Sequence, residues 1–341
     1  MKLKIVLSFF IFTAAALMLI SAGKGWHGPT PTPLKIPVGF PKPPTDIFKT
    51  NPLTEEGFQL GKKLFYDGGL SKDGEISCGS CHQPFAAFST YDHDLSHGVK
   101  NSFSTRNAPA LINLAWMRDL HWDGGINHIE VQPLFPLTAP NEMGMRLDSI
   151  MIHLKRDTAY RRMFRNAFGD ANISSERMLK ALAQFTGSLV SADSKYDKVK
   201  RGEATFIEPE KKGYELFKAN CNTCHREPLF TDNDFHNNGM SLNRFKDNGR
   251  QGISLKRTDS LKFKVPTLRN IALTIPYMHD GRIATLDMVM DHYTSLDTGL
   301  VALDPLLRHK ITMTPKEKKQ LVFFLYTLTD TAFTRNKRYA P

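Results

Sequence analysis

The chain carries two copies of the pattern C-x-x-C-H, Cys78-Gly79-Ser80-Cys81-His82 and Cys221-Asn222-Thr223-Cys224-His225. This pattern is typical of a covalently attached c-type haem. The two thiols bind the porphyrin, and the adjacent histidine is left to ligate the iron. The chain has four cysteines, and the two motifs use all of them. A disulfide, a zinc site and a thioredoxin-like redox pair are the alternatives, but the histidine that ends each copy favours two haem groups.

The first residues have the order of an export signal. Lys2 and Lys4 precede an apolar run over residues 5–20, and small residues follow at 21–23. Such an order is typical of a signal peptide, and the run is shorter than the about 20 residues of a membrane span. We expect residues 1–23 to be a cleaved signal peptide and the mature protein to be periplasmic. An uncleaved anchor is the alternative.

The rest of the chain predicts two domains. Residues 24–54 form a Pro-rich N-terminal segment, which we expect to be an extended tether. About 300 residues remain, enough for two domains, and a similar stretch precedes each motif. We therefore expect a mainly α protein in which two class I cytochrome c-like haem domains pack together, over residues 55–200 and 201–341.

Helix signals support this division. Thr54 can cap a helix that leads to the first motif, with Glu55 and Glu56 in its first turn. Pro209 suits the first turn of a helix that leads to the second motif. Each half then ends in a longer helix, one beginning near Ser174 or Ser175 and one at the capping box Thr314-Pro315-Lys316-Glu317. Helix, haem loop and C-terminal helix is the order of a class I cytochrome c.

The net charge of the chain excludes few classes of binding partner. The formal net charge is +11, but haem propionates and the surface can account for much of the excess of Lys and Arg. No nucleic-acid motif is present and the basic residues do not cluster, so we expect no nucleic-acid partner. An acidic patch on an electron-donor protein is a better match for a basic surface.

Further blocks lie around the two motifs. They are L-G-K-K-L-F at 60–65, R-N-A-P-A-L-I-N at 106–113, W-D-G at 122–124, N-E-M at 141–143, P-T-L-R-N at 266–270 and P-Y-M-H-D-G at 276–281. With these blocks the sequence resembles the bacterial dihaem cytochrome c peroxidase family, including its MauG-like branch, over nearly the whole mature chain. The resemblance implies a peroxidatic haem domain over 55–200 and an electron-transfer haem domain over 201–341.

The resemblance also assigns roles to single residues. His82 would hold the peroxidatic iron and His225 the electron-transfer iron. Glu142 matches the distal carboxylate that moves a proton between the peroxide oxygens, and Gln132 and Pro136 match positions that shape the same pocket. As a lone residue, Glu142 would be taken for a solvated loop residue.

Two further features follow from the resemblance. Trp122 matches a tryptophan between the haems that relays electrons, although an isolated Trp would be taken for a packed aromatic residue. Asn107, Thr274 and Pro276 match the ligands of a calcium ion between the domains, and oxygen ligands suit this hard cation.

Two distal iron ligands remain open. His97 matches a histidine that caps the peroxidatic iron in the oxidised resting state of many members. A surface histidine is the alternative, and His93 is close enough to be confused with it. Tyr293 falls on the position of the methionine that ligates the electron-transfer iron in the peroxidases, and the MauG-like branch has Tyr there.

The residues around Tyr293 give competing ligands. A small shift of the alignment would place Met288, Met290 or His292 on the ligand position instead. On a helix, His292 and Tyr293 point about 100° apart, so only one can face the iron. Leu286, Val289, Met290 and Tyr293 fall on one stripe that could pack on a haem. We expect Tyr293 to be the ligand.

These features predict a dihaem c-type peroxidase. It would reduce hydrogen peroxide to water with electrons from a small redox protein, a cytochrome c or a copper protein. The alternatives are a MauG-like oxidase, which acts on a partner protein or small molecule, and a non-enzymatic dihaem electron carrier. The expected cofactors are two covalently bound haem c groups and Ca²⁺, and a homodimer is an open alternative.

Overall fold

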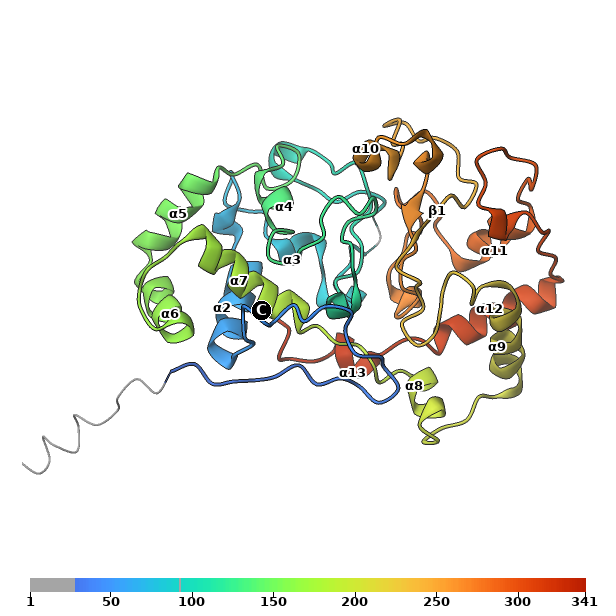
Figure 1. The fold of residues 1–341 in the computed structure, drawn as a ribbon, viewed down its shortest axis with the longest axis horizontal. Helices are drawn as coiled ribbons and strands as arrows, with labels where there is room; N and C mark the ends of the chain where they lie inside the picture. The colour runs from blue at the N-terminus through green and yellow to red at the C-terminus, as the bar shows by residue number, and fades with distance from the viewer. Residues whose placement is uncertain (1–27, 92) are drawn as a thin grey trace, which may run out of the picture.

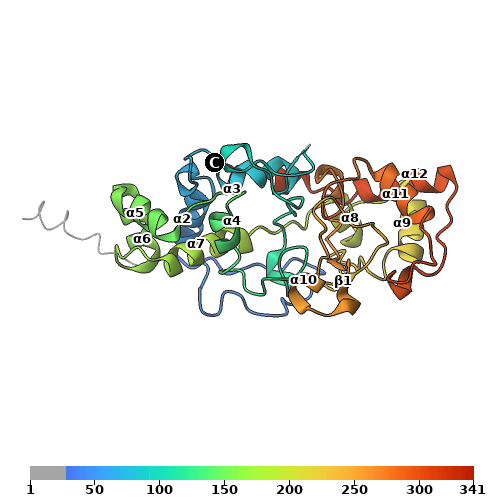
Figure 2. The same cartoon turned by 90° about the horizontal axis from the view of Figure 1, so that it is seen from above.

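The computed structural model describes residues 28–91 and 93–341. The expected signal peptide, residues 1–23, lies outside the described part. Two halves lie side by side along the long axis of the molecule (Figures 1 and 2). Helices dominate, and the described residues form one small sheet, in which β1 (Phe235–His236) pairs antiparallel with β2 (Phe263–Lys264). The prediction of a mainly helical protein is confirmed. Among the described residues, no helix has the length and apolar character needed to span a membrane.

In Figure 1 the first half lies on the left and the second half on the right. The helices of the first half are α2 (Glu55–Phe65), α3 (Cys78–Cys81), α4 (Leu134–Thr138), α5 (Leu147–Arg156), α6 (Thr158–Phe168) and α7 (Ser175–Gly187). Those of the second half are α8 (Lys195–Lys200), α9 (Glu208–Asn220), α10 (Gln251–Ser254), α11 (Leu286–Thr294) and α12 (Pro315–Tyr326). The last helix, α13 (Thr331–Thr334), packs back against the first half. Short 3₁₀ turns cover Gly68–Leu70, Pro84–Ala86, Val99–Asn101, Leu114–Trp116, Arg257–Asp259, Ile271–Leu273 and Pro305–Leu307.

The predicted caps begin the predicted helices. The Thr54 side chain accepts a hydrogen bond from the Gly57 amide at the start of α2, and Ser174 does the same for α7. Thr314 and Glu317 form the expected capping box of α12, with Pro315 in its first turn. Each such cap stabilises a helix by about 1 kcal/mol.

Each half repeats the same helix crossing. In the first half α2 packs against α7, and in the second α9 packs against α12. A glycine lies at each crossing: a Cβ at Gly61 would lie 2.0 Å from the Ala181 carbonyl oxygen, and one at Gly213 would lie 1.9 Å from that of Gln320. Only glycine allows this approach of the two backbones. The first motif lies a short loop beyond α2, and the second motif directly follows α9. The helix crossing in each half therefore fixes where the motif begins.

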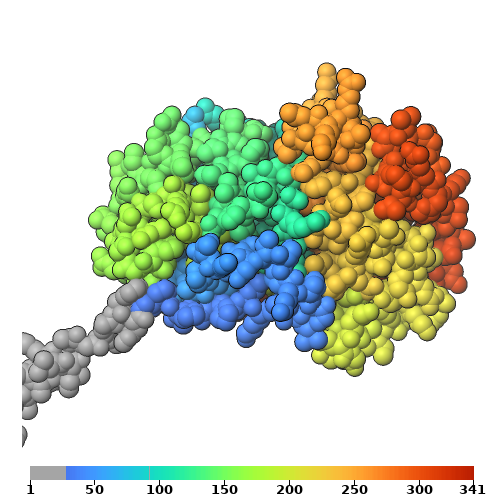
Figure 3. All heavy atoms as spheres, viewed as in Figure 1, coloured from blue at the N-terminus to red at the C-terminus, as the bar shows by residue number. Residues whose placement is uncertain are grey.

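The ends of the chain hold the two halves together. The N-terminal segment is extended as expected, but it packs on the body: Phe40 lies against Trp116, whose indole donates to the Pro41 carbonyl oxygen (2.8 Å). In Figure 3 this blue segment runs along the first half and reaches the yellow-green α8. The C-terminal residues return to the first half, where Phe333 and Tyr339 pack in its core. Tyr196 of α8, before the expected boundary at residue 200, packs in the core of the second half.

Candidate functional site

The first motif presents a histidine with one free ring nitrogen. Cys78 and Cys81 are the ends of α3, and both thiols are free of disulfides. His82 Nδ1 lies 2.7 Å from the Phe88 carbonyl oxygen. Because a carbonyl oxygen only accepts hydrogen bonds, Nδ1 carries the proton and Nε2 is left with its lone pair. Burial lowers the pKa of His82 to about 4, so the ring is neutral, as an iron ligand must be.

The second motif repeats this arrangement. His225 Nδ1 lies 3.2 Å from the carbonyl oxygens of both Phe230 and Pro266. Burial lowers the pKa of His225 as well. Cys221 and Cys224 are also free thiols. The disulfide interpretation therefore finds no support at either motif, and both fit the proximal side of a c-type haem.

A cavity joins the two halves beside the second motif. Its empty volume is about 1950 Å³, the mouth included. One part of its wall consists of Cys221, Cys224, His225, Met290 and Tyr293, and another of Asn107, His121 and Trp122. Most other lining residues are apolar. A large apolar cavity with two thiols and a neutral histidine at its wall fits a covalently held porphyrin.

A cluster beside Cys224 does not suit a metal ion. Cys224, Asp232 and His236 have possible ligand atoms within 4.8 Å of one another. However, His236 Nδ1 lies 2.7 Å from Asp304 and Nε2 lies 2.9 Å from Asp232. The bond to Asp232, followed by that to Asp304, raises the pKa of His236 to about 9. His236 is therefore a charged imidazolium with both nitrogens occupied, which argues against the zinc alternative here.

Helix α11 turns its predicted stripe to the cavity. Leu286, Val289, Met290 and Tyr293 all line it. The neighbouring His292 is held away, with Nε2 2.9 Å from the Asn238 carbonyl oxygen, and Met288 is 47% exposed. Burial, with smaller effects of the Cys221 and Cys224 thiols, raises the pKa of Tyr293 to about 12. Of the four ligand candidates, only Tyr293 and Met290 thus reach the cavity.

Sequence reasoning missed a third candidate in the same wall. Met278 lines the cavity, and its sulfur accepts a hydrogen bond from Asn238 Nδ2 (3.4 Å). The Asn238 side chain also lowers the pKa of the Tyr293 hydroxyl, against the larger effect of burial. Asn238 therefore binds the thioether of Met278 and influences the acidity of the Tyr293 phenol. The only signal in the sequence was that Met278 lies in the block P-Y-M-H-D-G.

Trp122 lies where the two halves meet. Its indole nitrogen donates to the Asn107 carbonyl oxygen (2.8 Å), and its own carbonyl oxygen accepts from the Lys264 amide (2.7 Å). Lys264 also lines the cavity, and burial lowers the pKa of its ammonium group to about 8. The next residue, Asp123, shares Arg106 with Asp247 of the second half, at 2.5 and 2.6 Å.

Glu142 faces the first motif. Burial raises the pKa of Glu142, and burial also raises the pKa of the Cys78 and Cys81 thiols, with a smaller contribution from the charge of Glu142. The loop that carries it is fixed by a bond from the Met143 amide to the Pro136 carbonyl oxygen (3.1 Å). Gln132 Nε2 lies 3.4 Å from His121 Nε2, in the cavity wall. Pro136 is thus held beside the loop of Glu142, while Gln132 lies next to His121.

The His97 ring points away from this region. It is exposed, with its centroid 4.6 Å from Phe103 and 5.2 Å from His93. It is the His97 carbonyl oxygen that faces Cys81, at 3.8 Å from the sulfur. The next turn is clasped to the Glu142 loop, because the Val99 amide donates to the Glu142 carbonyl oxygen (2.8 Å). Ligation of the iron by His97 would require the ring to leave Phe103 and turn inward.

The three predicted calcium ligands border one cavity. Asn107, Thr274 and Pro276 all line it. Asn107 is buried, its amide nitrogen donates to the His279 carbonyl oxygen (2.9 Å), and its Nδ2 donates to that of Asp94 (3.1 Å). These bonds use the donors of Asn107 and leave its side-chain oxygen for a cation.

Comparisons with known proteins agree with this site. A sequence model of the family described as di-haem cytochrome c peroxidase matches residues 55–205. The chain is 36% identical to the methylamine utilization protein MauG of Methylorubrum extorquens, over 82% of this chain and 80% of that one. It is 32% identical to the cytochrome c551 peroxidase of Nitrosomonas europaea, over 84% of each. Its fold resembles a crystal structure of a MauG-like protein associated with microbial copper homeostasis, with a TM-score of 0.83 and 34% identity over 90% of this chain and 98% of that one.

Proposed function

The chain belongs to the di-haem cytochrome c peroxidase family, and we propose that it is a peroxide-dependent oxidase of the MauG-like type. It would hold two class I cytochrome c-like haem domains and use hydrogen peroxide to oxidise a partner protein or small molecule. The observation that carries this proposal is Tyr293, which lies in the cavity wall close to Cys221 and Cys224. As a phenolate ligand it would stabilise the ferric state, whereas a thioether raises the haem potential.

Peroxide reduction with electrons from a small redox protein is the second candidate. Met290 and Met278 in the same wall favour it, because either sulfur would suit a high-potential electron store. The similarity to the cytochrome c551 peroxidase supports it as well. In both candidates the haems would be attached through Cys78, Cys81, Cys221 and Cys224, with His82 and His225 as proximal ligands.

The residues near the first motif would serve the reaction with peroxide. Bound haem supplies an iron that binds peroxide and accepts its oxidising equivalents. Glu142 would take a proton from one peroxide oxygen and return it to the other, a role worth roughly 10²–10⁴-fold in rate. Its raised pKa suits this task, because the carboxyl then exchanges protons closer to neutral pH. Gln132 and Pro136 would shape the space beside it.

Other residues would connect the two haems. Trp122 would relay electrons, since it is fixed between the halves by Asn107 and Lys264. A calcium ion on Asn107, Thr274 and Pro276 would brace the same junction. We also propose export to the periplasm, on the order of charged, apolar and small residues over 1–23.

Peroxide added to the oxidised holoprotein tests the proposal. Intact mass should first exceed that of the apoprotein by two haems. Peroxide without any donor should then produce a haem spectral change that lasts for minutes and decays faster when an oxidisable partner is added. Rapid turnover with a reduced cytochrome c or copper protein, and no lasting change without one, would favour the second candidate. A protein with one haem or none would refute both.

A further inference from the structure

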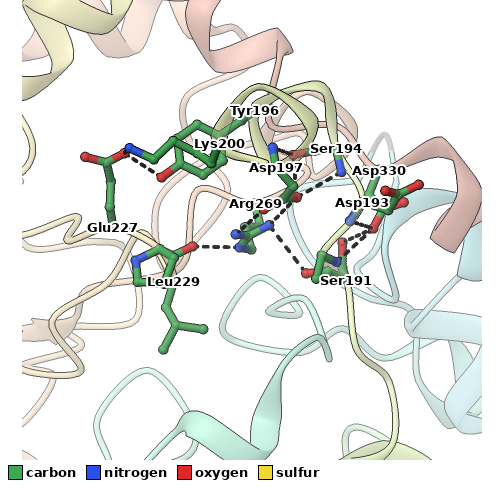
Figure 4. A network of polar contacts seen from close by, with 12 residues as sticks. Ser191, Asp193, Ser194, Tyr196, Asp197, Lys200, Glu227, Leu229, Arg269 and Asp330 are labelled. Atoms are coloured by element: carbon green, nitrogen blue, oxygen red, sulfur yellow. Dashed lines mark hydrogen bonds and ion pairs between the residues drawn. The ribbon is translucent and has the colours of Figure 1, made fainter. Parts of the chain in front are cut away.

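Two tyrosines share one carboxylate at the outer side of the second motif. Tyr196 is buried, and its hydroxyl donates to Glu227 Oε1 at 2.5 Å (Figure 4). The hydroxyl of Tyr214 on α9 donates to the same carboxylate, at 2.9 and 3.2 Å from its two oxygens. Each phenol therefore has a proton acceptor already in contact. A phenol with such a partner loses an electron more readily, because its proton has a place to go.

One ammonium group lies beside the shared carboxylate and balances its negative charge. Lys200 Nζ lies 3.9 Å from Glu227 and 3.3 Å from the Tyr214 hydroxyl. The same ammonium group lies 5.8 and 5.7 Å from the centres of the Tyr196 and Tyr214 rings. One buried phenol would be satisfied by any neutral acceptor, whereas this group brings two phenols, one carboxylate and one cation together.

Two phenylalanines lie between the cavity and the pair, which reaches the surface at its other end. The Tyr196 ring lies 4.8 Å from that of Phe230, and the Phe230 carbonyl oxygen accepts the bond from His225 Nδ1. Phe217 lines the cavity and contacts Phe230, with centroids 5.4 Å apart. At the outer end Tyr214 is half-buried, and the exposed Lys218 lies 4.7 Å above its ring.

The first half contains a tyrosine that is bonded in the same way but placed differently. The Tyr160 hydroxyl donates to Asp67 Oδ2 at 2.5 Å. Tyr160 lies on α6, in the core of the first half, and is not among the residues that line the cavity. Its hydrogen bond matches that of Tyr196, while it lacks the second phenol and the connection to a haem motif through a residue such as Phe230. Tyr160 is therefore the matched control.

We propose that Tyr196 and Tyr214, with Glu227 as their shared proton acceptor, are a redox-active pair that passes oxidising equivalents from the second haem site to a partner at the surface. This inference rests on the proposed function, in which hydrogen peroxide is the oxidant and takes up two electrons and two protons. One electron leaves Tyr196 for the oxidised haem site while its proton moves to Glu227. Tyr214 then returns an electron to Tyr196, Glu227 returns that proton to Tyr196, and the Tyr214 proton moves to Glu227. A reduced partner finally gives its electron to Tyr214, which regains its proton from Glu227. The relay runs twice for each peroxide, so the partner supplies both electrons, and the two protons that complete water come from the partner or the solvent.

The test is freeze-quench electron paramagnetic resonance of the holoprotein after addition of one equivalent of hydrogen peroxide. The parent should give a tyrosyl signal that narrows when the protein is made with ring-deuterated tyrosine. Replacement of both residues, Tyr196→Phe with Tyr214→Phe, should reduce this signal at least tenfold, and Glu227→Gln should reduce it with both rings in place. Tyr160→Phe should leave it unchanged. Haem spectra and peroxide consumption of the same samples show whether each variant is loaded and reacts.

Single variants keep the test decisive if the double variant does not fold. Tyr214→Phe alters only a half-buried hydroxyl and should leave a tyrosyl signal with a different hyperfine pattern, because the oxidised ring is then Tyr196. An unchanged pattern, or a signal that survives the double replacement, overturns the proposal. Peroxide consumption by the parent without any tyrosyl signal overturns it as well, while the proposed function stands. A fully loaded parent that consumes no peroxide overturns both.

Discussion

His292 and Tyr293 are adjacent on α11, yet of the two only Tyr293 lines the cavity. His292 Nε2 lies 2.9 Å from the Asn238 carbonyl oxygen, and this bond keeps the imidazole out of the cavity. Burial raises the pKa of the Tyr293 hydroxyl, and the Asn238 side chain lowers it to a smaller degree. Of these two neighbours, Tyr293 is therefore the one placed at the cavity wall.

Tyr293→Phe should change the spectrum of the second haem and raise its reduction potential, because an anionic ligand is lost. Tyr277→Phe is the control, since Tyr277 lines the same cavity but donates its hydroxyl to the Ile271 carbonyl oxygen (3.1 Å). Optical spectra and a redox titration of the holoproteins check this. Equal spectra of parent and Tyr293→Phe would assign the ligand to Met290 or Met278.

His97→Ala should leave the first haem unchanged. The exposed ring contacts Phe103 and His93 rather than the region of Glu142, so the oxidised parent should already have an open, high-spin iron. Electron paramagnetic resonance of the fully oxidised parent and variant measures the spin state. A low-spin parent that becomes high-spin on substitution would instead show that His97 is the resting-state ligand, as in many peroxidases of the family.

Local signals in the sequence predicted the helices that frame the site. The caps at Thr54, Ser174 and Thr314 are side-chain to backbone bonds within three residues, so they can be identified without tertiary structure. The stripe on α11 was predicted for the same reason, since its spacing is set by the helix itself. The residue roles that came from the family resemblance stay predictions.

The residues that complete the cavity could not be found in this way. Asn238 and Met278 come from two separate loops and Lys264 from β2, and no periodic pattern links the three. The packing of Phe40 on Trp116 was also unpredictable, because a Pro-rich stretch has no pattern that indicates which surface it covers. The return of Phe333 to the first half depends likewise on the arrangement of both halves.

Glu142→Gln should reduce peroxide turnover by roughly 10²–10⁴-fold and should stabilise the fold at neutral pH. Burial raises the pKa of Glu142 above its ordinary value of 4.5, so ionising it costs more in the folded than in the unfolded protein. This cost appears as pH rises through the unfolded pKa and is complete above the folded pKa. The amide lacks it. Thermal melts should show the gain at pH 7 and none at pH 3, and a variant less stable at pH 7 would contradict the assignment.

Removal of calcium should lower the melting temperature and disturb both haem spectra, because the expected ligands Asn107, Thr274 and Pro276 come from both halves. Chelation by EGTA, followed by return of Ca²⁺ or of Mg²⁺, checks this. Mg²⁺ should restore less, since it demands a tighter octahedral site. Asn107→Ala should abolish the response to calcium. Identical melts with and without EGTA, in a protein shown by metal analysis to have lost calcium, would refute the site.

Arg269→Ala should be among the most destabilising single substitutions at the junction. Arg269 is buried, and its guanidinium binds both oxygens of Asp197 at 2.8 and 2.9 Å (Figure 4). Its Nε donates to the Pro228 carbonyl oxygen (2.9 Å), and the group lies 4.7 Å from the Phe40 ring centre. Loss of one partner leaves a buried carboxylate without its charge partner, which costs about 3–5 kcal/mol of unfolding free energy.

The exposed pair Arg146–Asp148 gives the matched control for this substitution. It has a similar distance, 2.7 Å, but its side chains are 82% and 58% exposed, and Arg146→Ala should leave the unfolding free energy nearly unchanged because water screens the pair. Burial alone would raise the pKa of Asp197, yet the bonds and charge of Arg269 outweigh it and lower the pKa. The pair therefore stabilises the fold above the unfolded pKa of the carboxyl, and this contribution is lost as pH falls through the lower, folded value. Urea unfolding at pH 7 and at pH 3 should show a large difference between parent and Arg269→Ala at pH 7 and a smaller one at pH 3. Equal losses for Arg269→Ala and Arg146→Ala at pH 7 would show that the buried pair does not hold the junction.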